Sequence, residues 1–341
     1  MFDNSIDTPP FYVVSGGVIA DILDRNTAGL IDTVAETYLA HEKGQTTNPD
    51  SYFLRFPEQD LRRIIALPAA LHGDNGISGI KWIASYPSNL DKGLQRASAV
   101  LVLNDAETGY PIALLECGRI SAVRTAASAV LGAYWLNGKS RKAKTLSIIG
   151  GGYIARNIAE VFKADGWSFD EVLVHDLDEN SAQALSGFTS DKLGYASRQV
   201  DLNTALEADV VAFATNAGTP YVNPPNAFKS SQIVLNISLR DIAPELVLEC
   251  DNYFDDVSHC LKANTSPHLA EQLAGHQDFV TGTIGQVIRG EVSVDVNRPK
   301  IYSPFGMGIL DLALGQSLLQ TALDEKTAIE VPGFLGDVTR W

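Results

Sequence analysis

The sequence is poor in the residues that build disulfide frameworks and metal centres. It holds three cysteines, Cys117, Cys250 and Cys260, and no two of them have the CxxC spacing of a zinc ribbon. Its 6 histidines are scattered, and none pairs with another at the i, i+4 spacing of a helical metal site. We therefore expect no structural disulfide, no metal site and a reducing, cytoplasmic environment.

Positive charge is scarce as well. With Lys+Arg 26 against Asp+Glu 41, the formal net charge is -15, which repels phosphate backbones and anionic lipid surfaces. No stretch approaches the roughly 20 apolar residues of a membrane helix, and the segment MFDNSIDTPP lacks the basic and apolar regions of a signal peptide. We expect a soluble protein without a nucleic-acid or membrane partner. An anionic ligand would need a few cations gathered locally in one cleft.

Several catalytic motifs are also missing. GxSxG, HExxH and GxxxxGK[ST] do not occur, so hydrolase, metalloprotease and P-loop functions have no support. The chain has no internal repeat and no low-complexity tract. Its 341 residues, 45% hydrophobic and 20% charged, predict an ordinary globular protein of two domains.

The pattern up to about residue 138 predicts a β-rich domain. Residues 11–43 read as a short strand followed by helices, and the hairpin loop NDAETG separates the last two of the β-like runs that follow. A helix is expected from Cys117 to Leu136. The runs are SYFLRF, LRRIIAL, ISGIKWIASY, ASAVLVL and YPIALLE. Together they predict an antiparallel or mixed sheet.

From Ala143 onward, short apolar strands alternate with helical stretches, which is typical of a parallel sheet with crossover helices. A last amphipathic helix, with Ile309 and Leu318 on its apolar side, follows SPFGMG and is expected to return to the first domain. The strands are LSIIG, EVLVHD, VVAFAT, QIVLNIS and NYFDDV. The predicted fold class is α/β: a doubly wound Rossmann domain at 139–302, and an α+β domain at 1–138 with 303–341.

The stretch TLSIIGGGYIARNIAEVF combines a strand, a glycine cluster and a helix in the order of a dinucleotide site. Gly150, Gly152 and Ala155 occupy the GxGxxG/A positions, and Asp176 ends the next strand, where a carboxylate holds a ribose 2′-hydroxyl and repels a 2′-phosphate. NAD is therefore favoured over NADP; the alternative is a glycine turn that binds nothing. The expected cofactor contacts are Gly150, Gly151, Gly152, Tyr153, Ile154, Ala155, Asp176, Thr215, Asn216 and Ser238.

A lysine stands inside the apolar run ISGIKWIASYPSN. Period-2 alternation puts Lys81 on one face with Ile77 and Ile83, and Ile80 and Trp82 on the other. Such a lysine either snorkels to water, pairs with a carboxylate, or is a fixed cation that awaits an anionic ligand. The strand alone does not decide between these readings.

Five segments resemble the ornithine cyclodeaminase/mu-crystallin family, in the family's order and over nearly the whole chain. They are ISGIKWIAS, RASAVLVLNDAETGYPIALLE, ISAVRTAASAV, IIGGGYIA and LNISLRD. Within the family the chain looks most like the dehydrogenases of 2,3-diaminopropionate biosynthesis in siderophore and peptide-antibiotic pathways. The resemblance implies a substrate-binding first domain that forms a homodimer, with a Rossmann domain inserted before the returning helix.

The resemblance also assigns roles to basic residues. Lys81 in GIKW and Arg124 in SAVRTAA match the pair that grips the substrate α-carboxylate, with Arg124 expected mid-helix and an ordinary surface arginine as its alternative. Arg55 in YFLRF matches a third carboxylate ligand, and Arg62 or Arg63 could take its place. An arginine suits a bidentate grip, whereas a lysine acts as a point charge.

Asp241 matches the family's catalytic aspartate, which exchanges protons at the substrate nitrogen and activates water, and Lys81 is the second residue expected to be catalytic. Its alternative is an N-cap of the helix expected near Pro244. The chain departs from the cyclodeaminases at Ile65, where they place a glutamate and an apolar group cannot transfer protons. It departs again at Arg240, where they have glycine, so that Arg240 either adds a cation or points to solvent.

The reaction implied is oxidation of N-(1-amino-1-carboxy-2-ethyl)-glutamate by NAD+ to L-2,3-diaminopropionate and 2-oxoglutarate, with an upstream synthase as a candidate partner. A substrate with three carboxylates would explain a local cluster of Arg55, Lys81, Arg124 and either Arg96 or Arg240. Ornithine cyclodeamination is disfavoured by Ile65, and imine reduction with NADPH is disfavoured by Asp176. A mu-crystallin-like binding protein without turnover stays open.

Overall fold

The computed structural model describes residues 9–57, 62–223 and 228–336, and its contacts divide the chain into two compact units. Unit 1 comprises Met1–Asn26, Lys43–Ser121 and Met307–Trp341, and unit 2 comprises Thr27–Glu42 and Ala122–Gly306. Helix α3 (Gly118–Leu136) begins in unit 1 and ends in unit 2. Residues 27–42 and 122–138, which were assigned to the first domain from the sequence, belong to the contacts of unit 2. The division into a substrate-binding domain and an NAD-binding domain at residue 138 stays a prediction.

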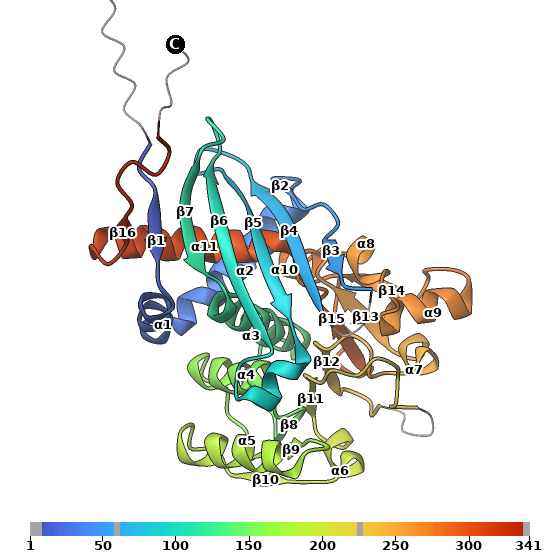
Figure 1. Cartoon of the computed structure of the whole chain (residues 1–341). Helices are drawn as coiled ribbons and strands as arrows, with labels where there is room; N and C mark the ends of the chain where they lie inside the picture. The colour runs from blue at the N-terminus through green and yellow to red at the C-terminus, as the bar shows by residue number, and fades with distance from the viewer. Residues whose placement is uncertain (1–8, 58–61, 224–227, 337–341) are drawn as a thin grey trace, which may run out of the picture. The chain divides into compact units, whose positions relative to one another are not determined.

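Unit 1 is built on a mixed sheet, as expected for the first part of the chain (Figure 1). Its order is β16-β1-β7-β6-β5-β4-β2, with β3 also paired to β4; β1 is parallel to β7, and the runs β4 to β7 are antiparallel. The strands are β1 (Tyr12–Val14), β2 (Thr46–Thr47), β3 (Tyr52–Arg55), β4 (Arg63–Leu71), β5 (Ile77–Ser85), β6 (Ala97–Asp105), β7 (Pro111–Glu116) and β16 (Ile329–Glu330). The NDAETG hairpin between β6 and β7 is confirmed.

Helix α11 (Gly308–Asp324) packs on β4, β5 and β6, and therefore covers one face of this sheet (Figure 1). Along β5, Ile77, Lys81 and Ser85 lie on that face and are buried. The predicted return of the last helix to the first sheet is confirmed, as is the alternation that gives Lys81 apolar neighbours. The remaining helical segments are α1 (Gly16–Arg25), which contacts α11, and the 3₁₀ helix η1 (Pro87–Lys92).

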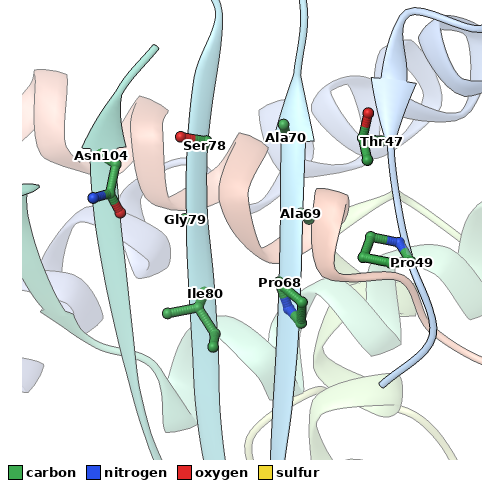
Figure 2. A pocket seen from close by; sticks show the side chains of 9 residues that line it. All are labelled: Thr47, Pro49, Pro68, Ala69, Ala70, Ser78, Gly79, Ile80 and Asn104. Atoms are coloured by element: carbon green, nitrogen blue, oxygen red, sulfur yellow. The ribbon is translucent and has the colours of Figure 1, made fainter. Parts of the chain in front are cut away.

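The opposite face of the sheet exposes apolar side chains. By register, Leu54, Trp82 and Val100 lie on this face, and they are 47%, 42% and 36% exposed. A pocket of 390 Å³ lies there, and Figure 2 shows the side chains that line it, with α11 behind the strands. Its lining residues are Thr47, Pro49, Pro68, Ala69, Ala70, Ser78, Gly79, Ile80 and Asn104.

Unit 2 contains the predicted parallel sheet (Figure 1). All of its strand pairs are parallel, in the order β10-β9-β8-β11-β12-β15-β13-β14. The strands are β8 (Thr145–Ile149), β9 (Glu171–His175), β10 (Ser197–Gln199), β11 (Val210–Phe213), β12 (Ile233–Asn236), β13 (Asp251–Phe254), β14 (Val280–Thr283) and β15 (Lys300–Ser303). The sequence predicted five of these. β10 (SRQ) and β14 (VTGT) were missed because they lack an apolar run, and β15 (KIYS) was missed as well.

Helices cover both faces of the parallel sheet, as the doubly wound class requires. One face packs its buried Val211 and Val234 with Leu206 of α6 and Leu246 of α7. On the other face, Ser128 of α3 is hydrogen-bonded to the Tyr302 hydroxyl of β15 at 3.0 Å. The helices are α2 (Thr27–Glu42), α3, α4 (Tyr153–Ala164), α5 (Glu179–Asp191), α6 (Leu202–Leu206), α7 (Pro244–Leu248), α8 (Val257–Cys260), α9 (Ser266–Ala274) and α10 (Ile284–Arg289).

The strand order reverses at β8, which has β9 on one side and β11 on the other. In open parallel sheets, ligands bind outside the carboxyl ends of the strands at such a reversal, because the crossover helices diverge there. The glycine cluster follows β8 directly and therefore lies at this point of unit 2. Among the described residues, no helix has both the length and the apolar composition to cross a bilayer.

Candidate active site

The glycine cluster forms a tight turn between β8 and α4. Gly150 has φ +105, and a Cβ on it would lie 2.5 Å from the carbonyl oxygen of Ala214, so a side chain is excluded for two reasons. Gly151 is equally confined, since a Cβ would lie 2.7 Å from the backbone of Ser181. The chain thus passes close to β11 and α5 and enters the helix at Tyr153.

Gly152 differs from its two neighbours. It is the N-cap of α4, and a Cβ on it would meet no atom within 4 Å. The space in front of the helix N-terminus is therefore open, while the first N–H groups of α4 carry the partial positive charge of the helix dipole. Ala155 is fully buried one turn later and packs the helix on the sheet. These residues fit the pyrophosphate of a dinucleotide.

Asp176 closes the same turn from β9. Its Oδ2 accepts a hydrogen bond from the Gly151 N–H at 2.5 Å, and its Oδ1 accepts from the Asp178 N–H at 2.8 Å. The carboxylate is therefore fixed beside the glycine turn, at the distance along the chain that the sequence predicted. The next two residues are not basic, since Leu177 is apolar and 97% exposed and Asp178 is acidic and caps α5. Neither residue therefore offers a cation to a 2′-phosphate. This arrangement suits a ribose diol better than a 2′-phosphate.

Asp241 is fully buried and accepts three hydrogen bonds from hydroxyl groups. Thr215 and Tyr221 donate to its Oδ1 at 2.5 and 2.9 Å, and Ser238 donates to its Oδ2 at 2.5 Å. Thr215 follows β11 and Ser238 follows β12, so the carboxyl ends of two adjacent strands supply the donors. The fourth member, Tyr221, lies in a loop and was missed by the sequence analysis, which had no pattern to place it.

The geometry rejects the alternative role of Asp241. Helix α7 is capped at Ala243, which makes no side-chain capping bond, so Asp241 does not cap it. Instead the backbone carbonyl of Asp241 accepts from the N–H groups of Tyr221 and Val222. Burial, together with the charge of Asp241, raises the pKa of Tyr221 above its usual range, so the phenol stays a donor. Thr215 and Ser238, predicted as cofactor contacts, hold the aspartate, while Asn216 is exposed.

Lys81 is 1% exposed and does not snorkel to water. Its Nζ donates to Asp311 Oδ2 at 2.5 Å and to Ser121 Oγ at 3.1 Å. Asp311 on α11 is 230 residues away in sequence and was missed by the sequence analysis. The available signal was a carboxylate inside the apolar stretch GILDLAL, where a charged residue needs a buried partner.

Ile65 of β4 lies on the same face of the sheet as Lys81. Register pairs Ile65 with Ile83, and pairs Leu67 with Lys81, two residues along each strand. The two residues that β4 places next to Lys81 on this face, Ile65 and Leu67, are therefore apolar. No proton-transferring group stands at the position where the cyclodeaminases are expected to have glutamate.

The arginines of unit 1 have distinct settings. Arg55 and Arg63 are directly paired across β3 and β4, and register places both on the face of Lys81. Arg62 instead lies over the ring of Tyr86 at 5.5 Å and bonds to Ser88. Arg63 therefore fits the alternative role better than Arg62 does. Arg96 is partly buried, which lowers the pKa of its guanidinium.

Arg124 of unit 2 is buried, at 8% exposed, so the surface alternative is wrong. Its guanidinium lies against Gly306, whose φ is +89 and whose missing side chain leaves the space that the arginine fills. Asp255 holds this loop, because its carboxylate accepts from the N–H groups of Phe305 and Gly306 at 2.9 and 2.7 Å. Burial raises the pKa of Asp255.

Arg240 donates to the carbonyl oxygen of Ala263 at 2.8 Å and is partly buried. Burial lowers its pKa, although the charge of Asp241 opposes that shift. Its guanidinium therefore does not simply point to solvent. The structure thus assembles one group of the predicted residues around the turn and Asp241 in unit 2, and another around Lys81 in unit 1.

Comparisons with known proteins agree with this architecture. The sequence profile described as "Ornithine cyclodeaminase/mu-crystallin family" matches residues 22–326. N-((2S)-2-amino-2-carboxyethyl)-L-glutamate dehydrogenase of Staphylococcus aureus is 29% identical over 303 residues, which are 86% of this chain and 89% of the relative. It is one of several relatives of similar length.

Two solved structures share the fold. Thermococcus litoralis Delta(1)-pyrroline-2-carboxylate reductase in complex with NADH and L-proline gives a TM-score of 0.86 at 21% identity, covering 94% of this chain and 100% of that chain. An archaeal alanine dehydrogenase dimer with bound NAD gives 0.85 at 22% identity, covering 95% and 100%. The likeness confirms the predicted combination of a Rossmann-type sheet with a second, β-rich sheet.

Proposed function

The chain belongs to the ornithine cyclodeaminase/mu-crystallin family, and from that premise we propose that it is an NAD+-dependent dehydrogenase of amino-acid C–N bonds. The observation that carries the proposal is the buried Asp241 carboxylate, which accepts hydrogen bonds from three hydroxyl groups. It lies past the carboxyl ends of strands in the same unit as the glycine turn. A binding protein without turnover would have no need for such a proton-exchanging group.

We propose NAD rather than NADP as the cofactor. Gly150, Gly151 and Gly152 would accommodate its pyrophosphate, and Asp176 would hold the adenosine ribose. When bound, the nicotinamide ring supplies the hydride acceptor. Two structural neighbours contain bound NADH or NAD, which supports this choice.

The proposed substrate is N-(1-amino-1-carboxy-2-ethyl)-glutamate, a secondary amine with three carboxylates. The S. aureus relative, which is 29% identical, is named as a dehydrogenase of such an amine. Lys81 and Arg124 would bind the glutamate α-carboxylate, and Arg55 or Arg63 would receive a further carboxylate. Several cations would then offset the repulsion that a chain of net charge -15 exerts on a polyanion.

The proposed reaction has three steps. Hydride leaves the glutamate Cα with its electron pair, which converts the C–N single bond into an iminium. Water adds to that carbon while Asp241 takes a proton from the water. Asp241 then returns the proton to nitrogen as the C–N bond of the carbinolamine breaks, and the carbinolamine hydroxyl loses its proton as the C=O bond forms. The products are 2-oxoglutarate, L-2,3-diaminopropionate, NADH and one proton. An upstream synthase must supply the amine.

We also propose a homodimer through unit 1. Leu54, Trp82 and Val100 are exposed on the sheet face that also carries the pocket, and an apolar sheet face of this kind is typical of an association surface. Figure 2 shows the pocket residues of this face. Sedimentation analysis is expected to give twice the chain mass, and Trp82→Glu should shift it toward the monomer. A monomeric wild-type protein would contradict the proposal.

The test of function combines the protein with NAD+ and the candidate amine, follows NADH formation and identifies both products by mass. We expect NADH with NAD+ and much less NADPH when NADP+ replaces it. Formation of proline from ornithine without net NADH would establish cyclodeamination instead, and reduction of cyclic imines with NADPH would establish a reductase. Cofactor binding without any turnover would leave a binding protein.

A further inference from the structure

The buried Lys81 has a partner that the proposed function does not use. Lys81 and Asp311 are 1% and 0% exposed, and their charged atoms are 2.5 Å apart. A buried ammonium without compensation would tend to lose its proton, because burial disfavours the charged form. The carboxylate of Asp311 supplies that compensation inside unit 1.

Helix α11 is shaped to bring Asp311 to this lysine. Gly308 and Gly315 lie three residues before and four residues after Asp311, which places all three on one side of the helix. A Cβ on Gly308 would lie 3.1 Å from the Leu67 carbonyl oxygen, and a Cβ on Gly315 would overlap the side chain of Leu101. A helix without side chains at these two points can therefore approach the sheet closely.

Leu67 and Leu101 are the residues paired with Lys81 on the two adjacent strands. The two glycines therefore contact the sheet on either side of the lysine, and the short side chain of Asp311 spans the remaining distance. Ser121, at the start of α3, accepts a second hydrogen bond from Lys81 Nζ. An ammonium has three donors and no acceptor, so two acceptors at different positions fix its orientation.

We propose that Asp311 is a positioning residue, which holds the Lys81 ammonium charged and oriented so that the lysine can bind a substrate carboxylate. This inference rests on the proposed function, which assigns carboxylate binding to Lys81. Asp311 itself does not contact the substrate. The residues paired with Lys81 on the adjacent strands, Leu67 and Leu101, are apolar. Ser121 brings a neutral hydroxyl to the ammonium, and Asp311 brings a negative charge.

The test measures 2-oxoglutarate binding to the full-length protein with NADH, from about pH 6.5 to about pH 9.5, a range below the ordinary pKa of lysine. In the wild-type protein the Kd should stay constant over this range, because Lys81 remains charged. In Asp311→Asn the Kd should be close to the wild-type value at the low end and rise at least about tenfold at the high end, because the neutral amine is then favoured. NADH binding should not change.

Asp24→Asn is the matched control. Asp24 pairs with Arg119 at 2.6 Å in the same unit, but its side chain is 63% exposed. This substitution should leave the pH profile of 2-oxoglutarate binding unchanged. A folded Asp311→Asn variant with the wild-type profile, or with equal weakening at every pH, would overturn the inference. If the variant does not fold, the wild-type profile decides, since weakening as the pH rises would contradict a lysine held in its charged form.

Turnover of the candidate amine is followed in the same samples, so that the two proposals can fail separately. Binding of 2-oxoglutarate that depends on Asp311, without amine oxidation, would refute the proposed reaction and keep the role of Asp311. Normal oxidation of the amine, with a wild-type pH profile of 2-oxoglutarate binding in Asp311→Asn, would keep the proposed reaction and refute the role of Asp311. Absence of 2-oxoglutarate binding in the wild-type protein would overturn the positioning role.

Discussion

The two units stabilise their buried charged groups in different ways. In unit 1, Lys81 faces the opposite charge of Asp311, whereas in unit 2 Asp241 faces the neutral hydroxyls of Thr215, Tyr221 and Ser238. An ionic partner fixes the protonation state of the group that it holds. Hydroxyl groups can donate to a carboxylate or accept from a carboxylic acid, so they tolerate both states. Lys81 is therefore suited to binding and Asp241 to proton exchange.

The largest effect is expected in unit 2. Asp241→Asn keeps the shape of the side chain and its hydrogen-bond acceptor but cannot take a proton, so kcat should fall by about 10²–10⁴-fold. NADH affinity should be retained, because the substitution lies outside the glycine turn. Steady-state rates with the candidate amine and a fluorescence titration of NADH measure the two quantities. A kcat within threefold of wild type would place the proton-exchanging group elsewhere.

The next effect tests the ionic partner in unit 1. Lys81→Met leaves the Asp311 carboxylate buried without its counter-charge, and the free energy of unfolding should fall by about 3–5 kcal/mol. Adding Asp311→Leu should recover most of that loss, because an apolar pair replaces the ion pair, while carboxylate binding stays absent. Urea denaturation of the single and double variants measures the recovery. Recovery of substrate binding in the double variant would show that the lysine charge has no binding role.

A smaller effect is expected where unit 2 seats Arg124. Gly306→Ala introduces a methyl group into the space of the guanidinium, at a backbone φ of +89 that disfavours alanine. The displaced arginine should lower kcat/KM by about 10–100-fold, mainly through KM, since binding geometry and not proton transfer is disturbed. Arg124→Ala, which removes the guanidinium altogether, should raise KM further and leave NADH binding largely intact. A Gly306→Ala variant with unchanged KM would contradict the assignment of Arg124.

The smallest effect separates the three hydroxyl groups around Asp241. Tyr221→Phe removes one donor and leaves those of Thr215 and Ser238, so kcat should fall by only about 2–10-fold, the usual contribution of one hydrogen bond. The pH dependence of kcat with and without the phenol measures its influence on Asp241. A loss as large as that of Asp241→Asn would mean that Tyr221 itself transfers the proton.

The local patterns in the sequence were sufficient to predict much of this architecture. Strand alternation placed Lys81 on a buried face, and the spacing of the glycine turn from the next strand placed Asp176 beside Gly151, where a hydrogen bond now joins them. Both features depend on neighbours along the chain, so periodicity and spacing carry the information.

The partners of the buried charges were not predicted, since they are distant in sequence. Asp311 meets Lys81 across 230 residues, and its approach depends on two glycines whose role is visible only when the helix rests on the sheet. Tyr221 reaches Asp241 from an irregular loop, which has no period. For the same reason, the choice between Arg62 and Arg63 required strand register, which a single sequence does not determine.

The central proposal is that Lys81 and Arg124 bind one carboxylate of the substrate while its α-hydrogen faces the nicotinamide. A crystal structure of the protein with NADH and 2-oxoglutarate tests it most directly. We expect the α-carboxylate of 2-oxoglutarate within hydrogen-bonding distance of Lys81 Nζ and the Arg124 guanidinium, with the carbonyl carbon against the nicotinamide ring and near Asp241. Lys81 and Arg124 remote from both bound molecules would contradict it.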